Sequence, residues 1–423
     1  MYRFALSFRE DMHIENLRIA LFNYISAKQN HEKFLILIDD RDKEQNIDGK
    51  DQEILEILQL FGIEYDQIIY QSENLKFHQQ LATKLLMDKN AFVCFCTAQK
   101  LENDITHSYD GTCKTLSDEE VLNNESPFLI RIKRPQEDIT FSDIIEGKLS
   151  FTPDEIDDFV IMNVDKTPTG TFAYALDDLM YDISMVIKQN RELPNTPKEI
   201  LIRKYLGYDK DIKYAHLPII LNENGKPLCK EDDLFNVKNL LLKGFLPSAI
   251  CNYIITMGND TPKKFFSLQE ALTWFDLSKI SKTPVKFEIE KLRQLNKEHI
   301  RNLDSLQLSK ALGYSSKEIG DLAKIYTHED STLEEIKLKI DNIFKTKNCE
   351  VFVKEFEILK KIAKDAPYHK SFDDYKAYLM RKSGLNGEAF FKPLQVLLTG
   401  TDSDIDLSEI YPHIKNYLGE IIK

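Results

Sequence analysis

A strand–helix–strand unit at the N-terminus constrains the fold of this 423-residue chain more than any other feature. Residues 2–8 and 34–39 (FLILID) are apolar runs of strand length, and they flank a helical segment from Met12 to Lys28. The apolar residues close to one face of that segment are Ile14, Leu17, Leu21, Phe22 and Ile25. A helix KDQEILEILQLFG ending at Gly62, a strand YDQIIYQS and a helix LKFHQQLATKLLMD follow. This alternation predicts an α/β fold with a parallel sheet and helical crossovers.

The pattern changes twice along the chain. Between about residues 91 and 165, short strands and turns such as AFVCFC and SPFLIRIKR indicate an inserted α+β module. Alternating α/β character then returns, and from about residue 233 nearly every segment has helical periodicity. We find no internal repeat and no low-complexity segment.

Composition excludes some classes of protein. The chain is 42% hydrophobic and 30% charged, and without a run of about 18 apolar residues it is not expected to span a membrane. The N-terminus lacks the apolar core of a signal peptide, and six cysteines are too few for a disulfide scaffold. We therefore expect a cytoplasmic protein. With a net charge of −13, it can bind nucleic acid only through a local basic face.

Nine stretches, taken in order, resemble one family. They are RFA with DMHIENLRIALFNYI, IDDRDKE, GKDQEILEILQLFGI, DKTPT, ALDDLMYDIS, NTPKEILI, YAHLPIILNENGK, VKNLLLKGFLPSAICNYI and FFKPLQVLLTG. Together they resemble the bacterial glutamyl-tRNA synthetases, a group of class I aminoacyl-tRNA synthetases, over essentially the whole chain. That family joins glutamate to tRNA with ATP and Mg²⁺. The resemblance implies tRNA and glutamate as partners of a monomeric protein, with no membrane and no DNA partner.

The resemblance implies a domain order. A class I Rossmann-type catalytic domain would carry the inserted α+β acceptor-binding module and precede an all-α anticodon-binding region. The expected parts are 1–90 and 166–222 (the two halves of the catalytic domain), 91–165 (the inserted module), 223–300 (the signature loop and stem contacts) and 301–423 (the anticodon-binding helices).

The resemblance also implies roles for residues that match the family's motifs. His13 and Lys230 would be catalytic, and His13, Asn16 and Lys230 would contact the nucleotide. Arg3, Ala5, Ser7 and Asp39 would hold the amino acid, with Arg3 on the glutamate side-chain carboxylate and Asp39 near the ammonium. The competing interpretation of Arg3 is an ordinary surface cation near the start of a strand, and His13 alone would more often be a surface histidine at a helix start.

Other motif positions have changed, and the altered positions are Glu10, Glu15, Gly170, Pro227 and Glu231. Glu15 replaces a glycine against which adenine packs in the family. A like charge some 6–8 Å from phosphate costs roughly 2–3 kcal/mol at an effective dielectric constant of about 20. KPLCKED replaces a lysine loop, so Pro227 and Glu231 remove two cations, although the stretch can also be a solvated turn. Gly170 replaces a pocket tyrosine, and KQNRE at 188–192 replaces RGEDH, losing the arginine that binds glutamate.

Two further features have competing interpretations. Cys94, Cys96 and Cys113 resemble a zinc site of some family members, with His107 at an irregular spacing as a fourth ligand. We expect buried cysteines without a metal. Lysines and aromatics interleave in helical segments of 300–423, which suits RNA binding but is also usual for solvated faces and cores.

These observations predict a glutamate–tRNA ligase with weakened activity. The alternative is a catalytically silent, divergent paralogue that binds tRNA or a partner. A third hypothesis, a ligase redirected to another substrate, rests on an opening of the pocket at Gly170.

Overall fold

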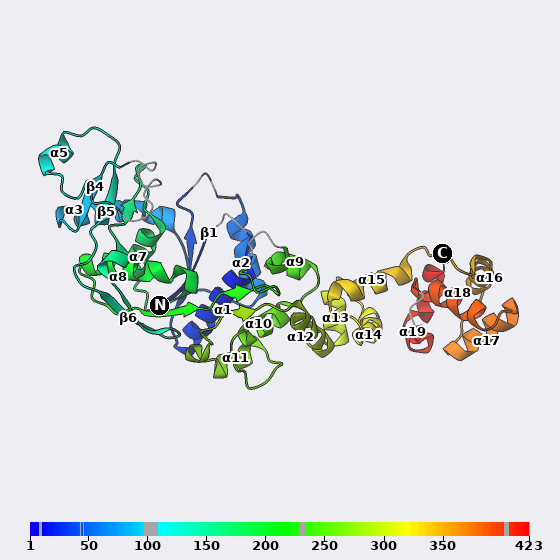
Figure 1. Ribbon diagram of the computed structural model, residues 1–423. Coiled ribbons are helices and arrows are strands. Elements are labelled where there is room, and N and C mark those ends of the chain that lie inside the picture. The colour runs from blue at the N-terminus through cyan, green and yellow to red at the C-terminus, as the bar shows by residue number, and fades with distance from the viewer. Residues whose placement is uncertain are drawn as a thin grey trace. The chain divides into compact units, whose positions relative to one another are not determined.

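The structure is a computed structural model that describes residues 1–7, 11–42, 44, 46–96, 109–228, 233–401 and 406–422. The chain forms two compact units (Figure 1). Unit 1 comprises Met1–Lys238 and Ile254–Glu288, and unit 2 comprises Asn239–Tyr253 and Ile289–Lys423. The finer boundaries within this division stay predictions.

Unit 1 contains a seven-stranded sheet in the order β3-β2-β1-β9-β10-β6-β7. Its strands are β1 (Tyr2–Ser7), β2 (Phe34–Asp39), β3 (Gln67–Tyr70), β6 (Ile139–Asp143), β7 (Gly147–Phe151), β9 (Met185–Gln189) and β10 (Lys213–Leu217). Strands β1 and β2 are parallel, with Tyr2 opposite Phe34 and Ser7 opposite Asp39. All neighbours except the antiparallel β6–β7 pair are parallel, which confirms the predicted parallel sheet.

The β6–β7 hairpin departs from the expected organisation. Its sequence lies within the predicted inserted module, yet β6 pairs with β10 and extends the main sheet. The Asp143 carboxylate helps to attach it, because this group lies 2.7 Å from Nδ1 of His216 on β10 and accepts hydrogen bonds from the backbone N–H groups of Ile145 and Glu146. The remaining strands of the segment form a separate antiparallel sheet, made of β4 (Ala91–Cys94), β5 (Leu129–Ile132) and β8 (Val160–Met162).

Helices cover both faces of the main sheet. The helices of unit 1 are α1 (Ile14–Gln29), α2 (Lys50–Leu60), α3 (Leu75–Met87), α5 (Asp118–Leu122), α6 (Pro153–Ile156), α7 (Gly170–Met180), α8 (Thr196–Tyr205) and α11 (Leu268–Trp274). Short 3₁₀ turns span Gln71–Asn74, Asn190–Asn195, Asp233–Phe235 and Leu277–Lys279, and β11 (Ile220–Leu221) pairs with β12 (Val285–Lys286). Gly62 has φ 69° just after α2, the left-handed conformation expected where that helix ends.

Helix α1 is buried almost all round, including the polar side chains of Arg18 and Asn23. It packs against the sheet and against α11, where the Phe22 and Phe275 rings are 4.8 Å apart. A helix enclosed on two sides shows little polar face. Because side chains alternate along β1, Arg3, Ala5 and Ser7 lie on the opposite face from Tyr2, Phe4 and Leu6.

All the regular secondary structure among the described residues of unit 2 is helical. Its helices are α12 (Ile289–Asn302), α13 (Ser305–Ala311), α14 (Lys317–Tyr326), α15 (Leu333–Phe344), α16 (Val353–Lys364), α17 (Phe372–Ser383), α18 (Glu388–Thr399), α19 (Leu407–Ile414) and α20 (Leu418–Ile421), with a 3₁₀ turn at Lys415–Tyr417. Helices α9 (Val237–Leu242) and α10 (Pro247–Thr256) each contain one crossing between the units, and the third crossing is at Glu288–Ile289, where α12 begins. The core of unit 2 includes Tyr326, Ile336, Phe356, Tyr375 and Phe390.

A search of the described helices for a membrane span found none that is both long and apolar enough.

Candidate active site

A cavity of about 280 Å³ lies at the carboxyl ends of β1 and β9, where open α/β sheets bind ligands. The side chains and backbone that line it belong to Arg3, Phe4, Ala5, Leu6, Ser7, Asn16, Ile19, Tyr174, Ile187, Lys188, Gln189, Arg191, Glu192 and Glu199. Four residues expected at the site, Arg3, Ala5, Ser7 and Asn16, are thus brought together. His13 and Asp39 are not among the lining residues.

Arg3 is buried rather than exposed, with 5% of its surface accessible, so it is not an ordinary surface cation. Its guanidinium makes a bidentate pair with Asp178 on α7, in which Nη2 lies 3.0 Å from Oδ2. Burial opposes the charged form, but the Asp178 carboxylate raises the pKa of Arg3 above its ordinary value. Arg203 on α8 lies 3.8 Å from the same carboxylate, so two cations share one anion.

Lys188 on β9 forms a second buried pair. Its Nζ lies 2.9 and 3.0 Å from the two carboxylate oxygens of Glu199 on α8. The two side chains are only 6% and 3% exposed, and both residues line the cavity. Lys188 stands where the family's arginine was expected, but its charge is neutralised within the chain.

Asp39, at the end of β2, is held by Arg41. The Arg41 guanidinium donates to both carboxylate oxygens at 2.9 and 2.7 Å, and it also donates to Gln71 and to the Pro168 carbonyl. The Tyr174 hydroxyl donates to Asp39 at 3.3 Å. A substrate ammonium would therefore have to share Asp39 with an internal cation.

Arg41 also lies next to Gly170, where the sequence predicts an opening. A Cβ atom at Gly170 would lie 3.3 Å from Nη2 of Arg41. Gly170 is the first residue of α7 and does not line the 280 Å³ cavity. The guanidinium therefore lies directly beside Gly170, and an opening of the pocket there stays a prediction.

His13 caps the N-terminus of α1 from a buried position and is not a surface histidine. Its Nδ1 accepts a hydrogen bond from the backbone N–H of Glu15 at 3.4 Å. The imidazole lies 5.9 Å from the Phe235 ring, and the His13 backbone bridges to Asn236. His13 is thus placed beside the chain that follows the lysine-loop segment.

Glu15, in the first turn of α1, has protein partners. Its carboxylate accepts a hydrogen bond from Gln189 at 3.2 Å, lies 3.8 Å from Arg191, and lies 3.5 Å from the backbone N–H of Ile220. Burial lowers the pKa of Arg18 to about 10, and the nearby Glu15 charge opposes that shift. An acid in the first turn also suits the helix dipole.

Little room is left beside Glu15. The cavity there has a volume of about 10 Å³, about what a single water molecule needs. Gln189 and Arg191 belong to the stretch that replaces RGEDH, so two of the departures from the family motifs contact each other. The Glu15 side chain is therefore packed closely against Gln189 and its other described neighbours.

The beginning of the expected lysine loop is an exposed hairpin. Asn222 and Lys226 exchange hydrogen bonds across a turn at Gly225, and Pro227 bridges back to Leu221. Gly225 has φ 75°, which favours glycine. This part fits the solvated-turn interpretation. Lys230, Glu231 and Glu10 lie outside the described residues.

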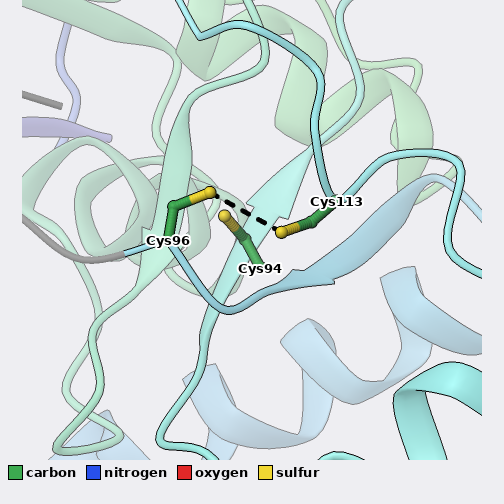
Figure 2. A group of neighbouring side chains, drawn as sticks. All are labelled: Cys94, Cys96 and Cys113. Atoms are coloured by element: carbon green, nitrogen blue, oxygen red, sulfur yellow. Dashed lines mark hydrogen bonds between the residues drawn. The ribbon is translucent and has the colours of Figure 1, made fainter. Parts of the chain in front are cut away.

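Cys94, at the end of β4, comes together with Cys96 and Cys113, which lie in the connection between β4 and β5 (Figure 2). Their sulfur atoms all lie within 4.8 Å of one another, and those of Cys96 and Cys113 are 3.6 Å apart. The Tyr109 hydroxyl lies 3.6 Å from Sγ of Cys94. Three thiols so placed fit three of the four ligands of a structural zinc site. His107 lies outside the described residues, and the expectation of cysteines without a metal stays a prediction.

The thiols differ in acidity. Burial raises the pKa of Cys96 to about 12. Burial also opposes ionisation of Cys113, but hydrogen bonds from the Phe95 backbone and the Tyr109 side chain lower the pKa of Cys113 below its ordinary value. A cluster with one stabilised thiolate is suited to a soft cation.

Aromatic residues proposed for RNA stacking divide between core and surface. Tyr326, Tyr375 and Phe390 are almost fully buried in unit 2, whereas Phe391 is 44% exposed. The core interpretation therefore holds for the first three.

The sequence analysis did not predict which residues pair with the charged groups of the site. These residues are Arg41, Asp178, Gln189 and Glu199. One signal pointed to Asp178: the sequence ALDDLM places two acids in an otherwise apolar helix, and buried acids need partners. Asp177 pairs with His78 at 2.9 Å, and Asp178 pairs with Arg3.

Comparisons with known proteins identify the family of the chain. Residues 1–294 match the family model of the class I tRNA synthetases (E and Q), catalytic domain. The chain is 50% identical to glutamate–tRNA ligase 2 of Sulfurimonas denitrificans and 51% identical to glutamate–tRNA ligase 1 of a Nitratiruptor species, in each case over the full length of both proteins.

The fold is similar to that of a solved glutamate tRNA ligase from Elizabethkingia meningosepticum. The TM-score is 0.80 at 23% identity, with 99% of this chain and 97% of that chain covered. This likeness concerns the fold, whereas the family model and the relatives extend to the sequence. The chain belongs to the glutamate–tRNA ligase family of class I tRNA synthetases.

Proposed function

We propose that this protein attaches glutamate to tRNA in an ATP-dependent reaction, with weakened activity. The observation that carries the proposal is the 280 Å³ cavity, whose wall contains Arg3, Ala5 and Ser7 of β1 and Asn16 of α1. Its volume suits an amino acid, and its polar groups converge on one space. The relatives named glutamate–tRNA ligases support the choice of substrate and acceptor.

The residue roles belong to the same proposal. His13 and Lys230 act on the nucleotide together with Asn16, while Arg3, Ser7 and Asp39 position the amino acid. ATP with Mg²⁺ supplies the activated phosphate, and the chain provides orientation and charge. We expect the protein to act as a monomer in the cytoplasm.

Weakened activity follows from charges that are already paired. Lys188 and Arg41 each lie within 3 Å of a carboxylate, so a substrate must compete with internal partners. Glu15 adds bulk and a negative charge near the expected nucleotide position.

A second candidate is a catalytically silent paralogue that binds tRNA without chemistry. The buried Glu15 carboxylate in the first turn of α1 favours it, because it adds bulk and negative charge where the resemblance places adenine and phosphate. The two candidates differ in whether ATP binds at all.

Charging of total tRNA with labelled glutamate, with and without ATP, separates them. We expect slow, ATP-dependent charging. Salt-sensitive tRNA binding without charging, and without ATP binding in calorimetry, would favour the silent paralogue. Charging at the rate of an intact synthetase assayed in parallel would contradict weakened activity.

A matched pair of variants tests the role of Glu15. Glu15→Gln removes the charge and keeps the bulk, whereas Glu15→Gly removes both. If charge dominates, both variants tighten ATP binding by a similar factor. If bulk dominates, only Glu15→Gly does so, and no change in either variant would reject the argument.

A further inference from the structure

Tyr174, on α7, connects the wall of the 280 Å³ cavity with two charged groups expected to hold an amino acid. It lines the cavity together with Arg3, whereas Asp39 does not. The centroid of its ring lies 5.3 Å from Cζ of Arg3, and its hydroxyl donates to Oδ2 of Asp39 at 3.3 Å. One side chain thus contacts both the cation from β1 and the anion from β2.

The Tyr174 ring adds to the contacts that orient Arg3. Asp178 binds the guanidinium through Nε and Nη2, and the ring makes a contact that uses neither of these hydrogen bonds. A cation within about 6 Å of the centroid of a tyrosine ring is attracted by the π-electrons. The ion pair and the ring together restrict the orientation of Arg3 at the cavity wall.

The Tyr174 hydroxyl contributes to the position of the Asp39 carboxylate. Asp39 stands opposite Ser7 in the parallel β1–β2 pair, one strand away from a residue that lines the cavity. Arg41 donates to both carboxylate oxygens, and the Tyr174 hydroxyl is a further donor to Oδ2. Burial and the Asp39 charge raise the pKa of Tyr174 above its ordinary value, so the hydroxyl keeps its proton and donates at neutral pH.

Packing limits the freedom of the Tyr174 side chain. The ring packs against an apolar cluster that includes Leu35, Leu37 and Val186. A Cβ atom at Gly170, about one turn earlier on α7, would lie 3.8 Å from Cε2 of Tyr174, in van der Waals contact. Because a tyrosine has only two side-chain torsions, a ring held in this way keeps both of its polar contacts in place.

We propose that Tyr174 is a positioning residue of this cavity, whose ring fixes the Arg3 guanidinium and whose hydroxyl fixes the Asp39 carboxylate. The inference rests on the proposed function, since it takes Arg3 as the partner of the substrate's side-chain carboxylate and Asp39 as the partner of its ammonium. It assigns different effects to the two parts of Tyr174: the hydroxyl acts on the ammonium end of the substrate, and the ring acts on the carboxylate end.

The test measures the binding of L-glutamate and of glutarate to the full chain by calorimetry. Glutarate has the two carboxylates of glutamate but no ammonium. Tyr174→Phe keeps the ring and removes the hydroxyl. It should weaken glutamate binding about fivefold or more and glutarate binding less than about twofold, because only the hydrogen bond to Asp39 is lost. In the charging assay, the KM for glutamate should rise in this variant, while the KM for ATP stays the same.

Tyr174→Leu removes the ring as well as the hydroxyl, so it should weaken the binding of both ligands. Tyr181→Phe is the matched control. Tyr181 directly follows α7 and its hydroxyl donates to Oδ1 of Asn74 at 3.2 Å, but it does not line the cavity. The control variant therefore loses one hydroxyl and one hydrogen bond, and it should bind both ligands as the unaltered protein does. Thermal unfolding checks that each variant is folded, and the two phenylalanine variants decide the question if Tyr174→Leu is not.

Two results would overturn the proposal: equal affinities of Tyr174→Phe and Tyr181→Phe for glutamate, or a loss of glutarate binding in Tyr174→Phe as large as the loss of glutamate binding. If glutarate binds to none of the proteins, the glutamate comparison decides alone. If glutamate is charged onto tRNA and the two phenylalanine variants bind it equally, only this inference fails. If the unaltered protein binds neither ligand and charges no tRNA, the proposed function fails as well.

Discussion

Arg41 shows how a single side chain can determine the character of this site. It neutralises Asp39, bonds Gln71 and the Pro168 carbonyl, and lies directly beside Gly170. Its side chain is 12% exposed and that of Asp39 is 11% exposed, so the pair is largely shielded from water. Removing one partner of such a pair leaves the charge of the other buried and unpaired, which destabilises the folded state.

We therefore expect Arg41→Ala to destabilise unit 1 by about 3 kcal/mol, as measured by urea unfolding. Arg41→Ala combined with Asp39→Asn removes the stranded charge and should recover part of that loss. If the double variant were as unstable as the single one, the Asp39 charge would not be the cause.

At the scale of elements, the close approach of helices α13 and α14 in unit 2 depends on a glycine, Gly320. A Cβ atom at Gly320 on α14 would lie 1.7 Å from the Ser305 carbonyl oxygen of α13. Gly419 on α20 is also helical, but a Cβ atom there would meet nothing within 4 Å. The same substitution should thus have opposite effects at the two positions.

Gly320→Ala should destabilise unit 2 by about 3 kcal/mol, because the backbone of α13 must move. Gly419→Ala should stabilise it by about 0.5–1 kcal/mol through helix propensity. Chemical denaturation followed by far-UV circular dichroism measures both. A neutral Gly320→Ala would contradict the close packing of α13 and α14.

At the scale of the whole molecule, two compact units imply that pH can act on one of them separately. His299 on α12 is 7% exposed, lies 3.1 Å from the Asn252 side-chain oxygen, and has its pKa lowered by burial to about 4. An unfolded histidine takes up a proton near pH 6.5. Between those values the unfolded state binds more protons, so stability falls as the pH decreases from 6.5 to 4.

His299→Gln should flatten this dependence. We expect the difference in unfolding free energy between variant and unaltered protein to shift in the variant's favour from pH 6.5 to pH 4. The affected transition should be the one that Gly320→Ala also lowers, which identifies unit 2. A difference that does not vary with pH would mean that His299 is not responsible.

The sequence by itself determined the family and the parallel sheet. The apolar run of strand length located β2 at its observed bounds, because backbone geometry links local pattern to local structure. Four residues named through the resemblance, Arg3, Ala5, Ser7 and Asn16, line one cavity in the structure, and their roles stay predictions.

Only the tertiary structure decided which charged side chains pair with each other. Arg3 meets Asp178 across 175 positions, and Gln189 meets Glu15 across 174. The two residues of each pair belong to a strand and a helix that are far apart in the sequence. Neither helical nor strand periodicity predicts which residues of such elements will pair. The sequence shows Glu15 as an acid at a phosphate site, whereas the structure shows it paired with Gln189 and Arg191. Charge balance depends on distance in space, which is why it became visible only in the folded chain.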